Sequence, residues 1–176
     1  RGCDLAISHL ISLGHRKIAF IACTSFREQV TRLRCDSYLN IMASHGLPGI
    51  FYEGFFLADS APSTQKDFLR QVKEGAITAV IASNSNAALM LYQICTESGI
   101  KIPESLSVLC FDHPNFFRQP SGNFFTYLEQ NSFDMGREAA LLLQQALSGE
   151  KKPDREQIVL QPALMVNQST RMLKEK

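Results

Sequence analysis

Three residues of this sequence have the chemical types needed to hold a polar small molecule: Arg34, Asn84 and Asp112. A guanidinium gives two parallel hydrogen bonds to hydroxyls or to a carboxylate. An amide both donates and accepts, as a hydroxyl-rich ligand requires. Aromatic candidates that can cover the apolar face of a sugar ring stand in the loops: Phe26, Phe116 and Phe117. Together these residues favour binding of a sugar-like ligand over turnover, because no nucleophile is paired with a base.

Each of these residues also has a plain structural explanation. Arg34 can be a solvated arginine, although it stands with Arg32 near the start of a predicted helix, where the helix dipole disfavours cations. Asn84 can be the N-cap of the following helix, and Asp112 can cap a turn. His113, directly after Asp112 at a predicted strand end, is either a donor to a ligand or a solvated loop residue. The residue types alone leave both explanations open.

Catalytic and metal-binding patterns are missing. The chain has no GxGxxG after its first predicted strand, no GxxxxGK[ST], no GxSxG and no HExxH. Residues 63–66 match SxxK, but the companion motifs of that enzyme class are missing. The four histidines and five cysteines lack metal-ligand spacing, so the cysteines are expected to be mostly buried free thiols. We therefore expect no catalytic residue, no metal and no cofactor. An enzyme that uses Asp112 and His113 is the least supported alternative.

Composition indicates one globular domain. The 176 residues are 45% hydrophobic and 20% charged, and the net charge is +1 without a basic run. This chain by itself is thus expected to bind nucleic acid poorly. Its apolar stretches fall short of the ~20 residues that a membrane helix needs, and no signal segment is recognisable. A cytoplasmic protein is expected, and the start on Arg1 suggests a piece of a longer one.

Apolar runs of strand length alternate with segments of helical periodicity. Strands are predicted at 17–23, 51–57, 77–83, 106–111, 124–128, 157–160 and 163–167, and helices at 5–13, 33–45, 64–74, 84–99 and 132–147. This α/β alternation predicts an open, mostly parallel sheet with helices on both faces. Ligands of such sheets bind beyond the carboxyl ends of the strands. Asn84 and Asp112 each follow a strand at that edge, which is where we expect the site.

Six motifs then occur in one order along the chain. They are AISHLISLGHRKIAFI at 6–21, RCDSY at 34–38, TAVIASN at 78–84, IPESLSVLCFD at 102–112, LEQNSFDMG at 128–136 and ST at 169–170. Their wording and spacing resemble the effector-binding module of the lactose repressor/galactose repressor (LacI/GalR-type) family of bacterial transcription regulators. The resemblance runs from end to end of the chain.

The resemblance implies a periplasmic-binding-protein-like fold of type I, with two α/β lobes and a ligand cleft between them. Residues 1–176 would be the C-terminal portion of that effector (sugar)-binding domain, mainly its C-terminal subdomain. The N-terminal subdomain and the DNA-binding headpiece would lie outside this chain. The helix at 132–147 resembles the one that crosses back to pack on the other lobe. Its apolar face would then need a partner: Met135, Ala139, Leu142, Leu143 and Ala146.

By the same resemblance, Arg34, Asn84 and Asp112 fall on effector-binding positions of the family. Gln130 lies in the crossover where the family often places a further polar contact. The chain departs from the family pattern at four positions near these motifs: Ser37, Ser85, Cys110 and His113. These departures suggest a pocket that accepts an unusual ligand or none.

The implied function is the ligand-sensing part of a homodimeric transcription regulator, repressor or activator. A small-molecule effector, expected to be a sugar, would change the affinity of an attached headpiece for operator DNA. The alternative is a periplasmic sugar-binding transport protein, which shares the architecture. The wording of the motifs favours the regulator.

Overall fold

The computed structural model describes residues 1–22, 28–56, 61–114, 118–119, 122–149 and 157–173. The helices are α1 (Gly2–Ser12), α2 (Gln29–Ser44), α3 (Ala61–Lys73), α4 (Ser85–Glu97) and α5 (Ser132–Ser148). The strands are β1 (Ile18–Ile21), β2 (Ile50–Tyr52), β3 (Ala79–Ala82), β4 (Ser107–Phe111), β5 (Arg118–Gln119), β6 (Gly122–Asn123), β7 (Thr126–Glu129) and β8 (Ala163–Met165).

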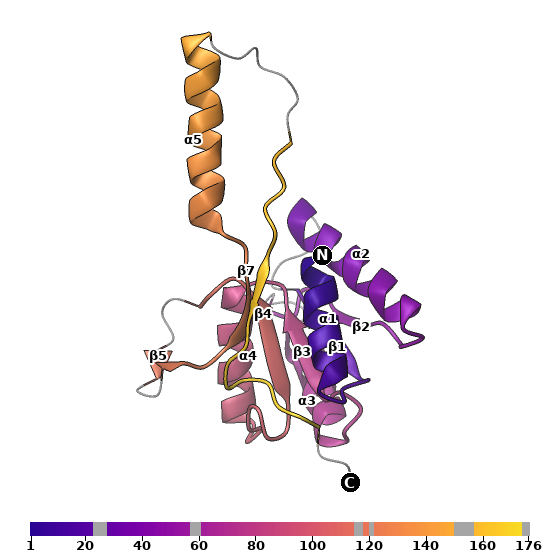
Figure 1. Cartoon of the computed structure of the whole chain (residues 1–176). Coiled ribbons are helices and arrows are strands. Elements are labelled where there is room, and N and C mark those ends of the chain that lie inside the picture. Colours follow the sequence, from indigo (N-terminus) through magenta and orange to yellow (C-terminus); the bar gives the residue numbers. More distant parts are fainter. Residues whose placement is uncertain (23–27, 57–60, 115–117, 120–121, 150–156, 174–176) are drawn as a thin grey trace.

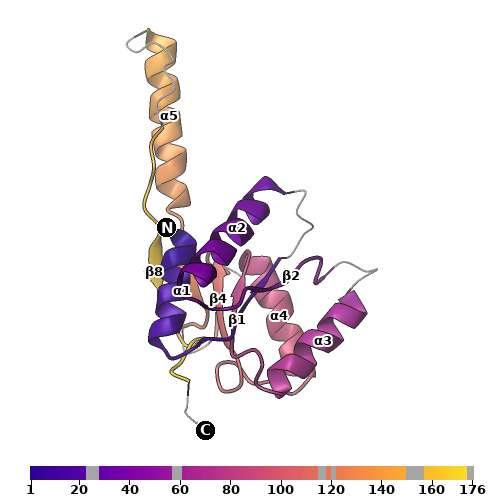
Figure 2. The same cartoon turned by 90° about the vertical axis from the view of Figure 1, so that its right-hand side faces the viewer.

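Six of these strands form one sheet in the order β2-β1-β3-β4-β7-β8. The pairings are parallel except at β8, which runs antiparallel to β7. Figures 1 and 2 show helices on both sides of this sheet. The predicted mostly parallel sheet is confirmed, and its crossovers cover both faces because parallel neighbours cannot be joined by a tight turn.

Two apolar cores lie on the two faces of the sheet. One contains side chains of α1 and α2, and the other contains side chains of α3 and α4. Strands β1, β3 and β4 are buried along their whole length. Successive residues alternate between the cores, as Phe20 and Ile21 illustrate. A strand buried on both faces is therefore apolar at nearly every position, with Ser107 at the start of β4 as the polar exception, which explains the long apolar runs in the sequence.

A buried tyrosine fastens α2 to two strands. The Tyr38 hydroxyl lies 2.8 Å from the carbonyl oxygen of Ile18 and 2.9 Å from that of Ile50, either of which can accept its proton. The amide of Ile50 donates to the same hydroxyl oxygen at 2.8 Å. Burial raises the pKa of Tyr38 to about 12, so the hydroxyl remains a donor at neutral pH. Helix α2, which carries Arg34, is thereby fixed relative to the sheet.

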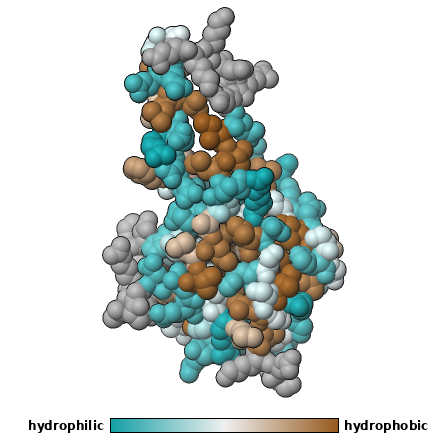
Figure 3. All heavy atoms as spheres, viewed as in Figure 1, coloured by the Kyte–Doolittle hydropathy of each residue, from teal (hydrophilic) through white to brown (hydrophobic). Residues whose placement is uncertain are grey.

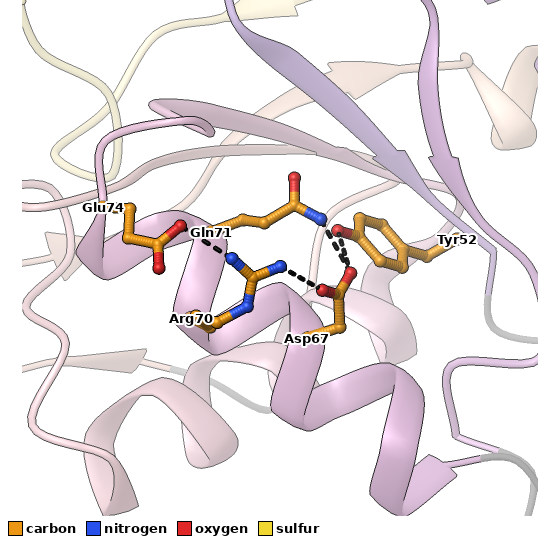
Figure 4. A network of polar contacts seen from close by, with 5 residues as sticks. All are labelled: Tyr52, Asp67, Arg70, Gln71 and Glu74. Atoms are coloured by element: carbon orange, nitrogen blue, oxygen red, sulfur yellow. Dashed lines mark hydrogen bonds and ion pairs between the residues drawn. The ribbon is translucent and has the colours of Figure 1, made fainter.

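Helix α3 carries a polar network on the other side of the molecule (Figure 4). One oxygen of the Asp67 carboxylate accepts from Gln71 at 2.7 Å and more weakly from the Tyr52 hydroxyl at 3.4 Å. Arg70 donates to Asp67 at 2.7 Å and to Glu74 at 2.8 Å. The hydrogen bonds from Arg70 and Gln71 lower the pKa of Asp67. The network joins α3 to β2 at a solvent-exposed surface.

Helix α5 extends away from the body of the molecule (Figures 1 and 2). None of its residues is buried, and Phe133 and Leu147 are 82% and 80% exposed. Brown, apolar side chains accordingly appear on the projecting part of the surface in Figure 3. The predicted helix is confirmed, and its apolar face lacks cover within the described part of the chain. No helix among the described residues is long and apolar enough to cross a bilayer.

Two sequence-based predictions of local structure need correction. The strand predicted at 157–160 is wrong, because that segment is irregular and the chain enters the sheet only at β8. Between the strands predicted at 106–111 and 124–128, where no strand was expected, the structure contains the short antiparallel pair β5 and β6. Apolar residues such as Ile158 and Val159 mimic a strand in composition, yet they are 44% and 60% exposed. A strand needs a hydrogen-bonding neighbour, and composition alone does not supply one.

The segment after β8 ties the sheet to α1. The Ser169 hydroxyl donates to the Val108 carbonyl at 2.5 Å and accepts from the Thr126 amide at 2.8 Å. The neutral ring of His15, which is 2% exposed, donates from Nε2 to the Arg171 carbonyl at 3.1 Å. Its Nδ1 lies 3.0 Å from the Thr78 hydroxyl, which then serves as donor. Both ring nitrogens of this buried histidine thus have a hydrogen-bond partner.

Acidification is therefore expected to destabilise the domain through His15. Burial, the largest cause, lowers the pKa of His15 below 6.5 in the folded state. The unfolded chain then binds more protons, so this stabilisation is complete above about pH 6.5 and is lost as pH falls towards the lowered pKa. Urea unfolding between pH 7.5 and 5 should show a decreasing free energy of unfolding. His15→Gln should flatten that decrease, whereas the exposed His45→Gln should leave it unchanged; equal slopes in all three proteins would contradict the assignment.

Candidate functional site

Arg34 lies at the carboxyl edge of the sheet, on the inner side of α2. Its Nη1 donates to the Ser83 carbonyl at 2.6 Å, and its Cζ lies 4.2 Å from the centroid of the Phe111 ring. The guanidinium is thus held by a strand-end carbonyl and by an aromatic face. These two contacts explain why an arginine occupies the first turns of a helix. Arg34 is therefore not merely a solvated surface arginine.

Gln130 joins Arg34 to Asp112. Arg34 Nη2 donates to Gln130 Oε1 at 3.0 Å, and Gln130 Nε2 donates to Asp112 Oδ1 at 2.5 Å. Both partners are charged, which makes each of these bonds stronger than a neutral one. Three of the predicted site residues therefore form one chain, in which an amide separates a cation from an anion.

Asp112 adopts a left-handed backbone conformation, with φ of +65°. Such a conformation costs free energy in most residues, although Asp tolerates it better than most. The Asp112 amide donates to the Leu128 carbonyl at 3.0 Å, which holds the residue after β4 beside β7. In this position the carboxylate accepts from Gln130 at the beginning of the crossover to α5.

Asn84 is the N-cap of helix α4, which confirms the structural role expected for it. Its Oδ1 accepts from the Ala87 amide at 2.8 Å. Capping uses the oxygen of the amide, and the amide nitrogen is chemically able to donate to a ligand as well. The preceding residue, Ser83, supplies the carbonyl that holds Arg34. Asn84 and Arg34 are thus neighbours at the same sheet edge.

Of the remaining predicted site residues, the structure describes His113 but not the three phenylalanines. The His113 ring packs edge to face on Tyr127, with centroids 4.7 Å apart, and Tyr127 belongs to the core beneath α3 and α4. His113 therefore lies on the opposite face of the sheet from α2, and its role in binding stays a prediction. Phe26, together with Phe116 and Phe117, lies outside the described residues.

A cavity of about 300 Å³ lies beside Arg34. Its lining includes Arg34, Ser37, Phe111, Gln130, Met135 and Pro162. The sequence motifs did not indicate Phe111 or Pro162, and the only usable signal for Phe111 was its place directly before Asp112. The lining combines two arginines, Arg34 and Arg1, with neutral polar side chains and apolar surface, which suits a small polar molecule.

Arg34 and Asp112 bring opposite charges close together at the site. Burial lowers the pKa of Arg34, while the nearby Asp112 carboxylate acts in the opposite direction. An arginine nevertheless stays protonated in a protein. No group of three or more potential metal ligands occurs among the described residues. The arrangement holds a guanidinium, an amide and a carboxylate in place for hydrogen bonding, and it contains no nucleophile with an adjacent base.

The cysteines are structural. Cys3, Cys35, Cys95 and Cys110 are free and buried. Burial raises the pKa of Cys3 and Cys35 to about 11 and that of Cys95 to about 12. Thiols of this kind are poor nucleophiles near neutral pH. For these four residues the prediction of buried free thiols is confirmed.

Comparison with known proteins identifies the fold family. A family model described as the periplasmic binding protein-like domain matches residues 7–170. The arabinose metabolism transcriptional repressor of Geobacillus stearothermophilus is 27% identical over 176 residues, which cover 97% of this chain and 48% of the repressor. The chain thus spans about half the length of the curated relatives it matches.

Solved structures agree with this result. A LacI-family transcriptional regulatory protein from Corynebacterium glutamicum superposes with a TM-score of 0.79 at 28% identity, over 97% of this chain and 64% of that protein. A LacI-family regulator from Enterococcus faecium, solved with bound ribose, gives a TM-score of 0.79 at 26% identity, over 99% of this chain and 63% of that one. The chain belongs to the periplasmic binding protein-like domain family, in the form that serves as the effector-binding domain of LacI-type transcription regulators.

Proposed function

We propose that this chain is the ligand-sensing C-terminal lobe of a transcription regulator that responds to a sugar or a similar small metabolite. The observation that carries the proposal is the chain of hydrogen bonds from Arg34 through Gln130 to Asp112 at the carboxyl edge of the sheet. A guanidinium, an amide and a carboxylate within one hydrogen-bonded group match the donors and acceptors of a polyhydroxylated ligand. Effector binding would alter the geometry of attached DNA-binding segments by preferring one arrangement of the protein over another.

The relatives favour a regulator over a transport protein. The arabinose relative is a transcriptional repressor, and the solved neighbours are transcription regulators, one of them with bound ribose. We assign the chain no enzymatic activity, since the site lacks a nucleophile with a base. Homodimer formation, operator DNA as a partner of a separate headpiece, and a cytoplasmic location belong to the same proposal.

The exposed helix α5 supports the presence of a second lobe. A compact monomer of 19.7 kDa is expected to expose about 8,600 Å², whereas this chain exposes 10498 Å². The apolar side chains of α5, such as Met135 and Leu143, are 48% and 61% exposed. Packing of α5 on the other α/β lobe of the effector domain would cover them and would close the ligand cleft from the other side.

Thermal unfolding of the intact protein with a panel of sugars tests this proposal. The panel should contain pentoses such as arabinose and ribose, hexoses, disaccharides and phosphorylated sugars. A ligand present at one hundred times its dissociation constant adds ~2.7 kcal/mol to the free energy of unfolding. We expect at least one uncharged sugar to raise the midpoint, and the same sugar to change the affinity of the intact protein for DNA upstream of its own coding region. A panel without any midpoint rise would contradict the sugar assignment.

A further inference from the structure

A second cavity, of about 440 Å³, lies at the amino edge of the sheet. Thr78 and Ser105 line it, and they stand just before strands β3 and β4. The candidate site around Arg34 lies beyond the opposite, carboxyl ends of the same strands. The five residues of β4 span about 16 Å, which separates the two places. The two cavities share no lining residue.

Segments from distant parts of the chain enclose this second cavity. They are the ends of α3 and α4, the turns before β3 and β4, and the segment after β8, which runs to this end of the sheet (Figure 1). Three buried apolar residues line it: Val72, Ile77 and Ile100. The hydroxyls of Thr78 and Ser105 add polar groups. Apolar walls with a few polar groups, at a volume of about 300–1,000 Å³, are typical of sites for small molecules.

Positive charge gathers at this cavity. Lys73 and Arg171 line it. Lys17 lies next to it, since its Nζ donates to the carbonyl of the lining residue Gly75 at 2.9 Å. This bond also compensates the carbonyl end of α3, so Lys73 is not needed for that purpose. Glu104 adds a single negative charge to the lining. The excess of positive charge favours an anionic ligand.

Lys17, Lys73 and Arg171 have no carboxylate partner within the part of the chain that the structure describes. The ion pairs found there involve other cations, namely those of Arg32, Arg70 and Arg137. Lys17 and Arg171 donate to backbone carbonyls instead. Such bonds hold a cation in place but leave its charge uncompensated, so an anion that enters the cavity gains the full attraction.

Arg171 is fixed in position before any ligand arrives. Its amide donates to the Ser107 hydroxyl at 3.1 Å, and its carbonyl accepts from the buried ring of His15 at 3.1 Å. Its guanidinium donates to the carbonyl of Glu104. The remaining N–H groups can give two parallel hydrogen bonds to a phosphate or a carboxylate. A side chain ordered in advance loses little further freedom on binding.

We propose that this cavity is a second ligand site, which takes a small organic anion. The phosphate or carboxylate group of the ligand contacts Lys73 and Arg171, and its apolar part covers Val72, Ile77 and Ile100. Because the two cavities have separate linings, this site does not depend on the sugar site around the candidate residues. A bound anion ties the ends of α3 and α4 to the segment after β8 and so stabilises the folded domain.

Isothermal titration calorimetry on the intact protein tests the site with four probes. Phenyl phosphate and benzoate each join an anionic group to an apolar ring, inorganic phosphate carries only the charge, and benzyl alcohol carries only the ring. Constant ionic strength keeps charge screening equal. We expect saturable binding of at least one aromatic anion, tighter than that of inorganic phosphate or benzyl alcohol. The tighter of the two aromatic anions identifies the charged group that the site prefers.

Substitutions locate the bound anion. Arg171→Gln should weaken its binding by at least about tenfold, since hydrogen bonds from a charged group are lost. Lys73→Gln should weaken it by up to about fivefold, because Lys73 is exposed. The matched control is Lys66→Gln, which removes the same charge from α3 at an exposed position outside this cavity. Its affinity should equal that of the parent. Circular dichroism verifies that each variant is folded.

Four results would overturn the inference. They are no saturable binding of either aromatic anion, equal affinity for inorganic phosphate or benzyl alcohol, parental affinity in both Lys73→Gln and Arg171→Gln, and loss of binding in Arg34→Ala, which would place the anion in the other cavity. Since Lys73 is exposed, Lys73→Gln keeps the test decisive even where Arg171→Gln does not fold. Failure of the proposed function has a different signature, namely that no sugar stabilises the protein.

Discussion

Arg34→Ala is expected to abolish stabilisation of the intact protein by its effector. Loss of hydrogen bonds from a charged group costs about 1.5–3 kcal/mol each, so two lost bonds weaken binding by at least about 100-fold. At a concentration that adds ~2.7 kcal/mol to the parent, such a variant retains only about 0.4 kcal/mol. Asp112→Ala should behave in the same way. Thermal unfolding with and without the sugar found in the panel measures both effects.

Arg32→Ala is the matched control for this experiment. Arg32 stands on the same helix, is exposed, and makes only a 4.0 Å contact with Asp36. An exposed pair of this kind contributes little to stability. We expect its ligand response to equal that of the parent. If Arg34→Ala kept the full response as well, the effector would bind elsewhere.

The second large effect is expected from Tyr38→Phe. Removal of the hydroxyl takes away the oxygen that accepts from the Ile50 amide and the proton that is donated to the carbonyl of Ile18 or Ile50. A buried donor left unsatisfied costs about 1–3 kcal/mol. We therefore expect a loss of about 2 kcal/mol in the free energy of unfolding, measured by urea denaturation. The volume of the ring stays, so the loss reports the hydrogen bonds and not a cavity.

Tyr52→Phe gives the comparison for this variant. The Tyr52 hydroxyl makes a longer bond of 3.4 Å to Asp67, which also accepts from Arg70 and Gln71. A weak bond to a group that keeps two other donors contributes little. Its loss should be clearly smaller than that of Tyr38→Phe. Equal losses in the free energy of unfolding would contradict the stabilising role of the Tyr38 hydroxyl between β1 and β2.

The central strands could be predicted from the sequence because burial on both faces of the sheet largely restricts their residues to apolar types. A strand covered on both faces is mostly apolar, and the runs around Phe20, Ile81 and Leu109 fit this pattern. The segment at 157–160 has a similar apolar composition but is not a strand. A strand also needs a pairing partner, and that partner comes from a distant part of the chain. The β5 and β6 pair was missed because two-residue strands leave no periodic pattern.

The site was predictable in part for a similar reason. Strands that run parallel bring their carboxyl ends to one edge, so Asn84 and Asp112 had to be neighbours. Spacing cannot tell whether a side chain there faces a ligand or packs internally, and His113 illustrates this with its contact to Tyr127. The bridging position of Gln130 depends on the crossover geometry, and only the family resemblance indicated this residue in advance.

The hydrogen bonds of Ser169 and Arg171 also affect when the domain can complete its folding during synthesis. Ser169 connects β4 with β7, and Arg171 reaches back to the buried His15, across 61 and 156 positions of the chain. On a ribosome, domains generally fold as units while the chain emerges at about 5–20 residues per second. Strands β4 and β7 leave the exit tunnel well before Ser169, so their unpaired groups wait for it. We therefore expect the Val108 carbonyl and the Thr126 amide to gain this partner only after residue 169 has emerged.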